Sequence, residues 1–108
     1  MTRSDAGSHP ALAEAQRLVD ANDPYAAHEV LEQVWKATSG DERDFWRGVT
    51  QAVVALEHAK RGNEVGHGRL RERAALTLDP YAGQVLHGVD VDVLRAALRD
   101  GAPLPRLA

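Results

Sequence analysis

The sequence contains no cysteine, one methionine and one phenylalanine among 108 residues, and aromatic side chains make up only 5% of it. The lack of cysteine excludes disulfide bonds, thiolate metal sites and a cysteine nucleophile. The few aromatic side chains offer no stacking platform for nucleic acid. No apolar run approaches the roughly 20 residues that a membrane-spanning helix needs, so we expect no membrane insertion.

Motifs of several enzyme classes are also missing. The glycines after Arg61 are not followed by the Lys-Ser/Thr pair of a phosphate-binding loop, and no serine stands in a nucleophile elbow. Residues 1–10 lack the apolar stretch of a secretory signal, so we expect a cytoplasmic protein. A net charge of -3 argues against a dedicated nucleic-acid binder, which usually carries a strong basic excess. The residues identify no reaction, and whether the protein is an enzyme stays open.

What is present is the composition of an ordinary globular protein, with 44% hydrophobic and 27% charged residues. A chain of 108 residues fits one domain with one modest core. Apolar residues recur at helical spacing in five segments, and no segment has the pattern of a strand of useful length. We therefore predict a single all-α domain over residues 1–108, a compact bundle of about five helices, with frayed ends at residues 1–8 and 103–108.

Local signals set the expected helix boundaries. Asp23-Pro24 is an N-cap followed by a first-turn proline, Gly62-Asn63 is a stop, and Asp90 is a further N-cap. The third segment has the widest apolar face, so it should be the central and most buried helix, capped by Asp41 or its neighbours. A glycine-containing connection should join the last two helices. The expected helices span residues 10 to about 21, 24 to about 38, 41 to about 61, about 64 to 78, and 91 to about 100.

Three side chains of the second helix, His28, Glu32 and Trp35, follow one another at i, i+4 and i+7. At about 100° per residue they form one stripe on the flank of the apolar face, where side chains are half-buried. A histidine and a carboxylate one turn apart can hydrogen-bond or share a metal ion. The plainer interpretation is that Glu32 orients His28, or pairs with an arginine, while Trp35 covers the core.

Gln51 and His58 lie seven residues apart on the third helix and therefore share a face. If this face turns toward the second helix, it meets His28 and Glu32 and forms a polar pocket, a common place for ligand and metal sites in bundles. If the face turns outward, both are surface residues, and the sequence does not decide between these two arrangements. The name polar seam is used below for His28, Glu32, Trp35, Gln51 and His58.

The polar seam could hold a divalent metal. His28, Glu32 and His58 are a two-histidine, one-carboxylate set that suits zinc or non-haem iron. One hypothesis is therefore a metal-dependent hydrolase or oxidase that uses these three residues. The second helix carries His-Glu-x-x-Glu and not the His-Glu-x-x-His of zinc proteases. Of the three other histidines, His9 and His87 are expected to be loop residues near helix ends or turns.

Two further functions fit the residues. The first, which we favour, is a binding or interaction module, and the wide apolar face of the third helix would also suit a homo-oligomer. The second is a nucleic-acid-associated accessory protein, and the acidic net charge counts against it. Its basic patch would use residues that are close in the sequence, Lys60, Arg61, Arg69, Arg71 and Arg73.

Several blocks of the chain match one known pattern: YAAHEVLEQVW at 25–35, FWRGVTQA at 45–52, His58, and RGN at 61–63. The pattern continues through Gly66, Leu70, Leu78, Tyr81, residues 88–91 and Leu94. These blocks resemble the signature of the prokaryotic family catalogued as domain of unknown function 309, over nearly the whole chain after about residue 10. The resemblance implies a compact all-helical domain and a bacterial or archaeal cytoplasmic protein, and it implies no activity.

Two residues depart from the pattern of that family. Thr50 stands where an aliphatic residue is expected, and His67 stands where a small residue is expected. His67 is therefore not expected to belong to a site that the family shares.

Overall fold

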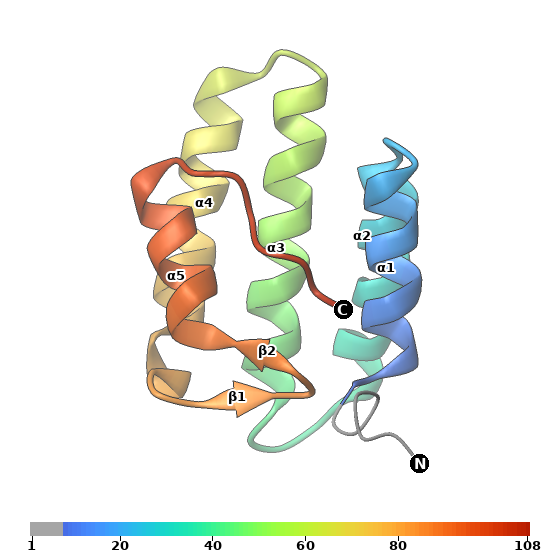
Figure 1. Ribbon diagram of the computed structural model, residues 1–108, viewed down its shortest axis with the longest axis vertical. Helices are drawn as coiled ribbons and strands as arrows, with labels where there is room; N and C mark the ends of the chain where they lie inside the picture. The colour runs from blue at the N-terminus through green and yellow to red at the C-terminus, as the bar shows by residue number, and fades with distance from the viewer. Residues whose placement is uncertain (1–7) are drawn as a thin grey trace.

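The computed structural model describes residues 8–108 and confirms the predicted all-α bundle (Figure 1). A short 3-10 helix and a hairpin of two-residue strands lie between the last two α-helices. The elements are α1 (Pro10–Asp20), α2 (Pro24–Ala37), α3 (Arg43–Lys60), α4 (Glu64–Leu78), η1 (Asp79–Tyr81), β1 (Val85–Leu86), β2 (Val89–Asp90) and α5 (Val91–Asp100). Within residues 8–108, no helix is both long and apolar enough to cross a bilayer.

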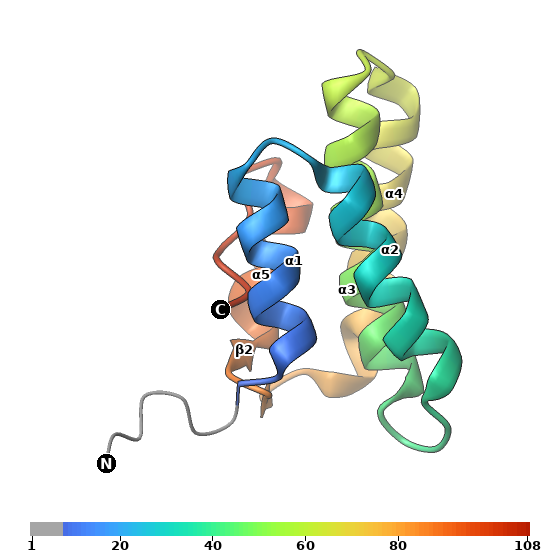
Figure 2. The ribbon, with the colours of Figure 1, turned by 90° about the vertical axis from the view of Figure 1, so that its right-hand side faces the viewer.

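The helices form two layers (Figure 2). Helices α2, α3 and α4 lie side by side with α3 in the middle, and α1 and α5 cover one face of this layer. Helix α1 packs mainly on α2, and α5 packs mainly on α4. The hydrophobic core fills the space between the layers, and its fully buried side chains include Leu12, Leu31, Phe45, Leu78 and Leu94. No helix of the described chain covers the opposite face of the three-helix layer.

Side-chain caps start α2 and α4 where the sequence predicts them. The Asp23 carboxylate accepts the backbone N–H of Ala26 at 3.1 Å, and the Asn63 side chain accepts that of Gly66 at 3.0 Å. Each bond satisfies one of the N–H groups that the first turn of a helix leaves unpaired. These two caps therefore fix both ends of the segment that contains the polar seam.

The start of α3 differs from the prediction in one contact. Its N-cap residue is Glu42, whose side chain makes no capping hydrogen bond. The Glu42 carboxylate lies 2.8 Å from Nε2 of His87, in the turn of the β1–β2 hairpin. His87 and Gly88 both have positive φ, 51° and 83°, as a tight two-residue hairpin turn requires. The N-cap position thus falls on a neighbour of Asp41, as predicted, but the Glu42 carboxylate contacts His87 and makes no capping hydrogen bond.

Helix α3 is the central and most buried helix, as predicted. It contributes eight buried residues, against at most four from any other helix. A Cβ on Gly48 would lie 2.6 Å from Cγ of the fully buried Leu78, so this glycine lets α3 and α4 approach closely. Thr50, the departure from the family pattern, is accommodated because its buried hydroxyl donates to the Trp46 carbonyl at 2.7 Å.

The C-terminal segment, which we expected to be frayed, lies against α1. Leu107 is buried, and its backbone N–H donates to Oε1 of Gln16 at 2.6 Å. The Gln16 amide in turn donates to Asp20 at 2.9 Å, and Arg106 lies 3.2 Å from the same carboxylate. The segment thus crosses from α5 to α1 over α3 (Figure 1). The expected fraying of residues 1–7 falls outside the described residues.

Candidate functional site

His28 and Glu32 lie on the flank of α2, as their spacing predicts. Nδ1–H of His28 donates to the carbonyl of Tyr25 at 3.0 Å, and Nε2 lies 3.8 Å from Oε1 of Glu32. The other Glu32 oxygen lies 3.8 Å from Nζ of Lys36. The two side chains are 20% and 34% exposed, so both are half-buried. The local contacts orient the imidazole and leave the carboxylate shared between two weak ionic contacts.

Trp35 completes the stripe on α2. Its indole ring lies under the guanidinium of Arg43, whose Cζ is 5.4 Å from the ring centroid. This geometry is a cation–π contact across the α2–α3 loop. The indole Nε1 is buried and has no hydrogen-bond partner. The indole N–H of Trp35 is therefore buried by packing but donates no hydrogen bond.

Gln51 of α3 has the complementary property, because its Oε1 is a buried acceptor without a partner. Among residues 8–108, these two atoms are the buried side-chain nitrogens and oxygens that lack a hydrogen bond. Helices α2 and α3 run antiparallel, and Nζ of Lys60 donates to the Asn22 carbonyl at their far end. Trp35 stands near the C-terminal end of α2 and Gln51 in the middle of α3, and these two helices are neighbours. The two side chains are called the Trp35–Gln51 pair below.

His58 is engaged at the other end of α3. Seven residues separate it from Gln51, which corresponds to about 10 Å along a helix. Its Nδ1 accepts from Nδ2 of Asn63 at 3.0 Å and lies 3.2 Å from Nη2 of Arg61. The ring also packs against the start of α4, where a Cβ on Gly66 would lie 3.0 Å from Nδ1. His58 thus supports the α3–α4 joint.

The three-ligand metal set expected from His28, Glu32 and His58 is not assembled. In residues 8–108, no group of three or more His, Asp or Glu side chains is arranged to hold a metal ion. The physical reason is that the ring of His58 is held at the α3–α4 joint by Asn63 and Arg61. The sequence could not predict which contacts would hold the imidazole of His58, because Asn63 and Arg61 reach it only once α3 and α4 pack together.

The basic residues expected to form one patch are dispersed. Nζ of Lys60 is bonded to the Asn22 carbonyl, and Arg61 lies 3.4 Å from Glu57. Arg71 is 7% exposed and faces α5, whereas Arg69 and Arg73 are exposed. The arginine run therefore splits between two sides of α4 and supplies no continuous basic surface.

A histidine cluster that the sequence analysis missed lies where the N-terminus of α1 meets the hairpin. His9 caps α1 by accepting the N–H of Ala11 at 3.0 Å, and its ring centroid lies 4.8 Å from that of Trp46. The His87 ring is 5.5 Å from His9 and 5.4 Å from Trp46, and it pairs with Glu42. These residues are far apart in the sequence, and only the turn dipeptide His87-Gly88 gave a local signal. The cluster joins the start of α1, α3 and the hairpin through two edge-to-face contacts of His9 and one tilted contact between Trp46 and His87.

Two curated proteins are similar to this chain. An uncharacterized protein of Aquifex aeolicus strain VF5 is 31% identical over 90 residues, which cover 82% of this chain and 27% of that protein. The uncharacterized protein YpuF of Bacillus subtilis strain 168 is 41% identical over 49 residues, which cover 44% of this chain and 28% of YpuF. The chain thus spans less than a third of the length of either relative.

No solved structure matches the chain. A family model described as domain of unknown function, DUF309, matches residues 12–70, which include all of α2 and α3 and the whole polar seam. The model match and the Aquifex relative agree with the resemblance carried by the YAAHEVLEQVW and FWRGVTQA blocks. The chain therefore belongs to the DUF309 family of domains of unknown function.

Proposed function

We propose that this domain is a binding module and that the Trp35–Gln51 pair receives one polar group of its partner. The observation that carries the proposal is the presence of one buried donor and one buried acceptor, both without partners, on facing helices. A ligand that offers an acceptor to the Trp35 indole and a donor to the Gln51 carbonyl would satisfy both.

The energetics support a binding role. Leaving a buried polar group without a hydrogen bond costs about 1–3 kcal/mol. Native domains have a total stability of roughly 5–15 kcal/mol. Two such groups would therefore remove a substantial part of the stability of a domain of 108 residues. A partner that completes both bonds would recover that free energy on binding. The alternative is that the indole N–H bonds directly to the Gln51 carbonyl after side-chain rotation, which would make the pair purely structural.

The chemistry of the pair favours an amide. A peptide or carboxamide group carries one N–H donor and one carbonyl acceptor at neighbouring positions, which matches one acceptor and one donor on the domain. A carboxylate offers acceptors only and would leave the Gln51 carbonyl unsatisfied. The proposed partner is therefore a protein segment that presents a peptide group, and no reaction is assigned to the site.

Fluorine NMR of protein labelled with 5-fluorotryptophan tests this proposal. The chain has two tryptophans, and Trp46 lies in the histidine cluster, so it serves as an internal control. N-acetylglycinamide should shift the Trp35 resonance, whereas acetate should not, and neither should shift Trp46. The variant Gln51→Met keeps the length of the side chain and should abolish the response.

The structural alternative has a different signature. If Gln51→Met changes the Trp35 indole proton shift in the absence of ligand, and N-acetylglycinamide has no effect on the wild type, the two residues bond to each other and the proposal is wrong. We also propose a cytoplasmic location, with which the absence of cysteine is consistent. Fractionation of cells that express the protein would test the location.

A further inference from the structure

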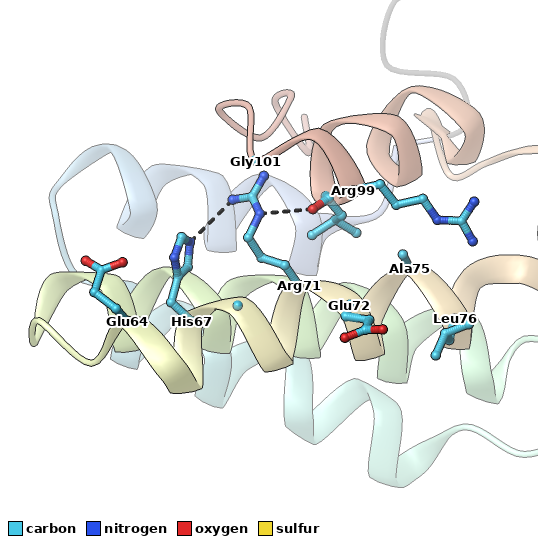
Figure 3. Close-up of a pocket in the computed structure, with 10 residues that line it drawn as sticks. Glu64, His67, Arg71, Glu72, Ala75, Leu76, Arg99 and Gly101 are labelled. Atoms are coloured by element: carbon cyan, nitrogen blue, oxygen red, sulfur yellow. Dashed lines mark hydrogen bonds between the residues drawn. The ribbon is translucent and has the colours of Figure 1, made fainter.

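Arg71 of α4 ties down the last turn of α5 (Figure 3). Its Nε–H donates to the carbonyl of Leu98 at 3.1 Å, and Nη2 donates to the carbonyls of Ala97 and Ala102, each at 2.5 Å. Carbonyls at a helix C-terminus lack intrahelical partners and carry partial negative charge, so a guanidinium suits them. This arrangement explains why an arginine is 7% exposed inside a small domain.

One nitrogen of this guanidinium, Nη1, makes no hydrogen bond to a carbonyl. An arginine has five N–H donors, and the α5 carbonyls take those on Nε and Nη2. Nη1 has only His67 Nε2 at 3.5 Å, which is long for a hydrogen bond. None of the ion pairs among residues 8–108 includes Arg71. A buried cation with free donors and no carboxylate partner is a suitable place for an anion.

A pocket of about 620 Å³ opens between α4 and α5 beside Arg71. This volume falls in the range of sites for small molecules. One part of its wall is apolar, formed by Ala75, Leu76 and Leu98. Two carboxylates also line it, but Glu64 lies on the far side of His67 from Arg71, and Glu72 points away from α5 (Figure 3).

We propose that the pocket between α4 and α5 binds a small aliphatic carboxylate, with the carboxylate on Nη1 of Arg71 and the hydrocarbon chain on Ala75 and Leu98. The anion accepts the N–H donors that the α5 carbonyls do not use. The apolar wall covers the chain, so charge and hydrocarbon are both required for tight binding. This site is separate from the Trp35–Gln51 pair. The result of a binding test at the pocket therefore leaves the proposed function of that pair unaffected.

The shape of the proposed site favours an aliphatic monoanion over phosphate. The charged side chains that line the pocket are two carboxylates, Glu64 and Glu72, and a second cation, Arg99, which points away from Arg71 (Figure 3). A single carboxylate also matches one guanidinium corner, whereas phosphate has no group to place against the apolar wall. Inorganic phosphate is therefore the comparison that separates general anion attraction from the proposed site.

The test measures binding of hexanoate, hexanamide and inorganic phosphate to the full chain by calorimetry or ligand-observed NMR. Hexanamide has the same chain and lacks the charge, so it should bind about tenfold more weakly than hexanoate or worse, as expected for loss of a charged hydrogen bond. Phosphate should also bind more weakly than hexanoate. Equal binding of hexanoate and hexanamide, or no binding of hexanoate at millimolar concentration, would overturn the proposal.

Gly68 offers a blocking variant that should still fold. It lines the pocket, and a Cβ there would meet no atom within 4 Å. Gly68→Leu therefore places a side chain in the pocket while the Arg71 residue itself is kept, and it raises the helix propensity of α4. We expect hexanoate affinity to fall about tenfold or more. The matched control is Val65→Leu, an exposed position on α4 outside the pocket, which should bind like the wild type.

Arg71→Lys adds a second test of the anion contact. A lysine keeps the positive charge but has three donors on one nitrogen, and the α5 carbonyls would take them. Hexanoate binding should therefore be lost while the charge is retained. If this variant does not fold, the Gly68→Leu result decides alone: hexanoate binding at wild-type affinity to Gly68→Leu would refute the site.

Discussion

The Trp35–Gln51 pair and the Arg71 junction are two places where polar side chains are buried, and they differ in how those groups are satisfied. Trp35 and Gln51 each leave a buried polar atom without a partner, whereas Arg71 donates to three carbonyls that lie 26 to 31 residues further along the chain. A buried polar group that is paired stabilises the fold, and one that is unpaired weakens it until something binds. At Arg71, most of the donors hold α4 and α5 together and only Nη1 is left for a ligand, whereas both buried atoms of the Trp35–Gln51 pair are left for one.

The largest effect should come from Arg71→Leu. This change removes the side-chain donor of the Leu98 and Ala102 carbonyls, whereas the Ala97 carbonyl keeps the backbone N–H groups of Gly101 and Ala102, so we expect the free energy of unfolding to fall by roughly 3 kcal/mol. Urea denaturation monitored by circular dichroism measures it. Arg73→Leu, on the exposed side of α4, is the control and should change stability by less than about 0.5 kcal/mol. If the two variants were equally stable, Arg71 would not hold α5.

The helices can be predicted from the sequence, but the contact of Arg71 with α5 cannot. Asp23-Pro24, Gly62-Asn63 and Asp90 act within three or four residues, so helix boundaries could be predicted from local pattern. Arg71 stands in a run with Arg69 and Arg73, and nothing local distinguishes the arginine that turns inward. Its partners belong to α5, so its role depends on the packing of α4 against α5.

Gly48→Ala should have the next largest effect and should test whether the two regions respond separately. The new Cβ would lie 2.6 Å from Cγ of the buried Leu78, and overpacking of this kind costs about 1–3 kcal/mol. The gain in helix propensity from replacing glycine is smaller, about 0.5–1 kcal/mol. We expect a net loss of stability with displacement of α4, while the fluorine resonance of Trp35 stays unchanged. A large shift of that resonance would show that the regions are coupled.

Two glutamines allow the comparison to be made with one residue type. Gln51 has a buried oxygen without a partner, whereas the Gln16 amide donates to Asp20 and accepts the N–H of Leu107. Gln51→Met should leave stability unchanged or raise it by up to about 1 kcal/mol, and Gln16→Met should lower it by about 1–3 kcal/mol. Thermal unfolding of both variants measures the difference. Equal losses would mean that Gln51 has a partner in solution and that the Trp35–Gln51 pair is not open.

The sequence predicted part of the polar seam for the same reason that it predicted the helices. His28, Glu32 and Trp35 are three or four residues apart on one helix, so their common stripe follows from helical geometry alone. The positions of His58, His9 and His87 depend on the α3–α4 joint and on the hairpin. Strands of two residues carry too little pattern to reveal such a hairpin in advance.

The smallest effect on stability should come from Asp20→Asn, because the Asp20 carboxylate is paired but exposed. Hydrogen bonds from Gln16 and Arg106 hold the pKa of Asp20 below its ordinary value. A carboxyl group whose pKa is lowered by folding contributes stability above its unfolded pKa, and that contribution disappears as the pH falls through the folded pKa. The wild type should therefore lose attachment of the C-terminal segment below about pH 4, and Asp20→Asn should not show this component of the acid response.

Other carboxylates also titrate in that range, including Glu14, whose pKa is lowered by its hydrogen bond with Arg17. The informative quantity is therefore the difference between the two proteins, measured as the pH dependence of the Leu107 amide signal by NMR. Identical acid responses would show that the Asp20 carboxylate does not hold the segment. A small but real difference would complete the comparison, because it would show that pairing without burial contributes little, whereas pairing with burial, as at Arg71, contributes most.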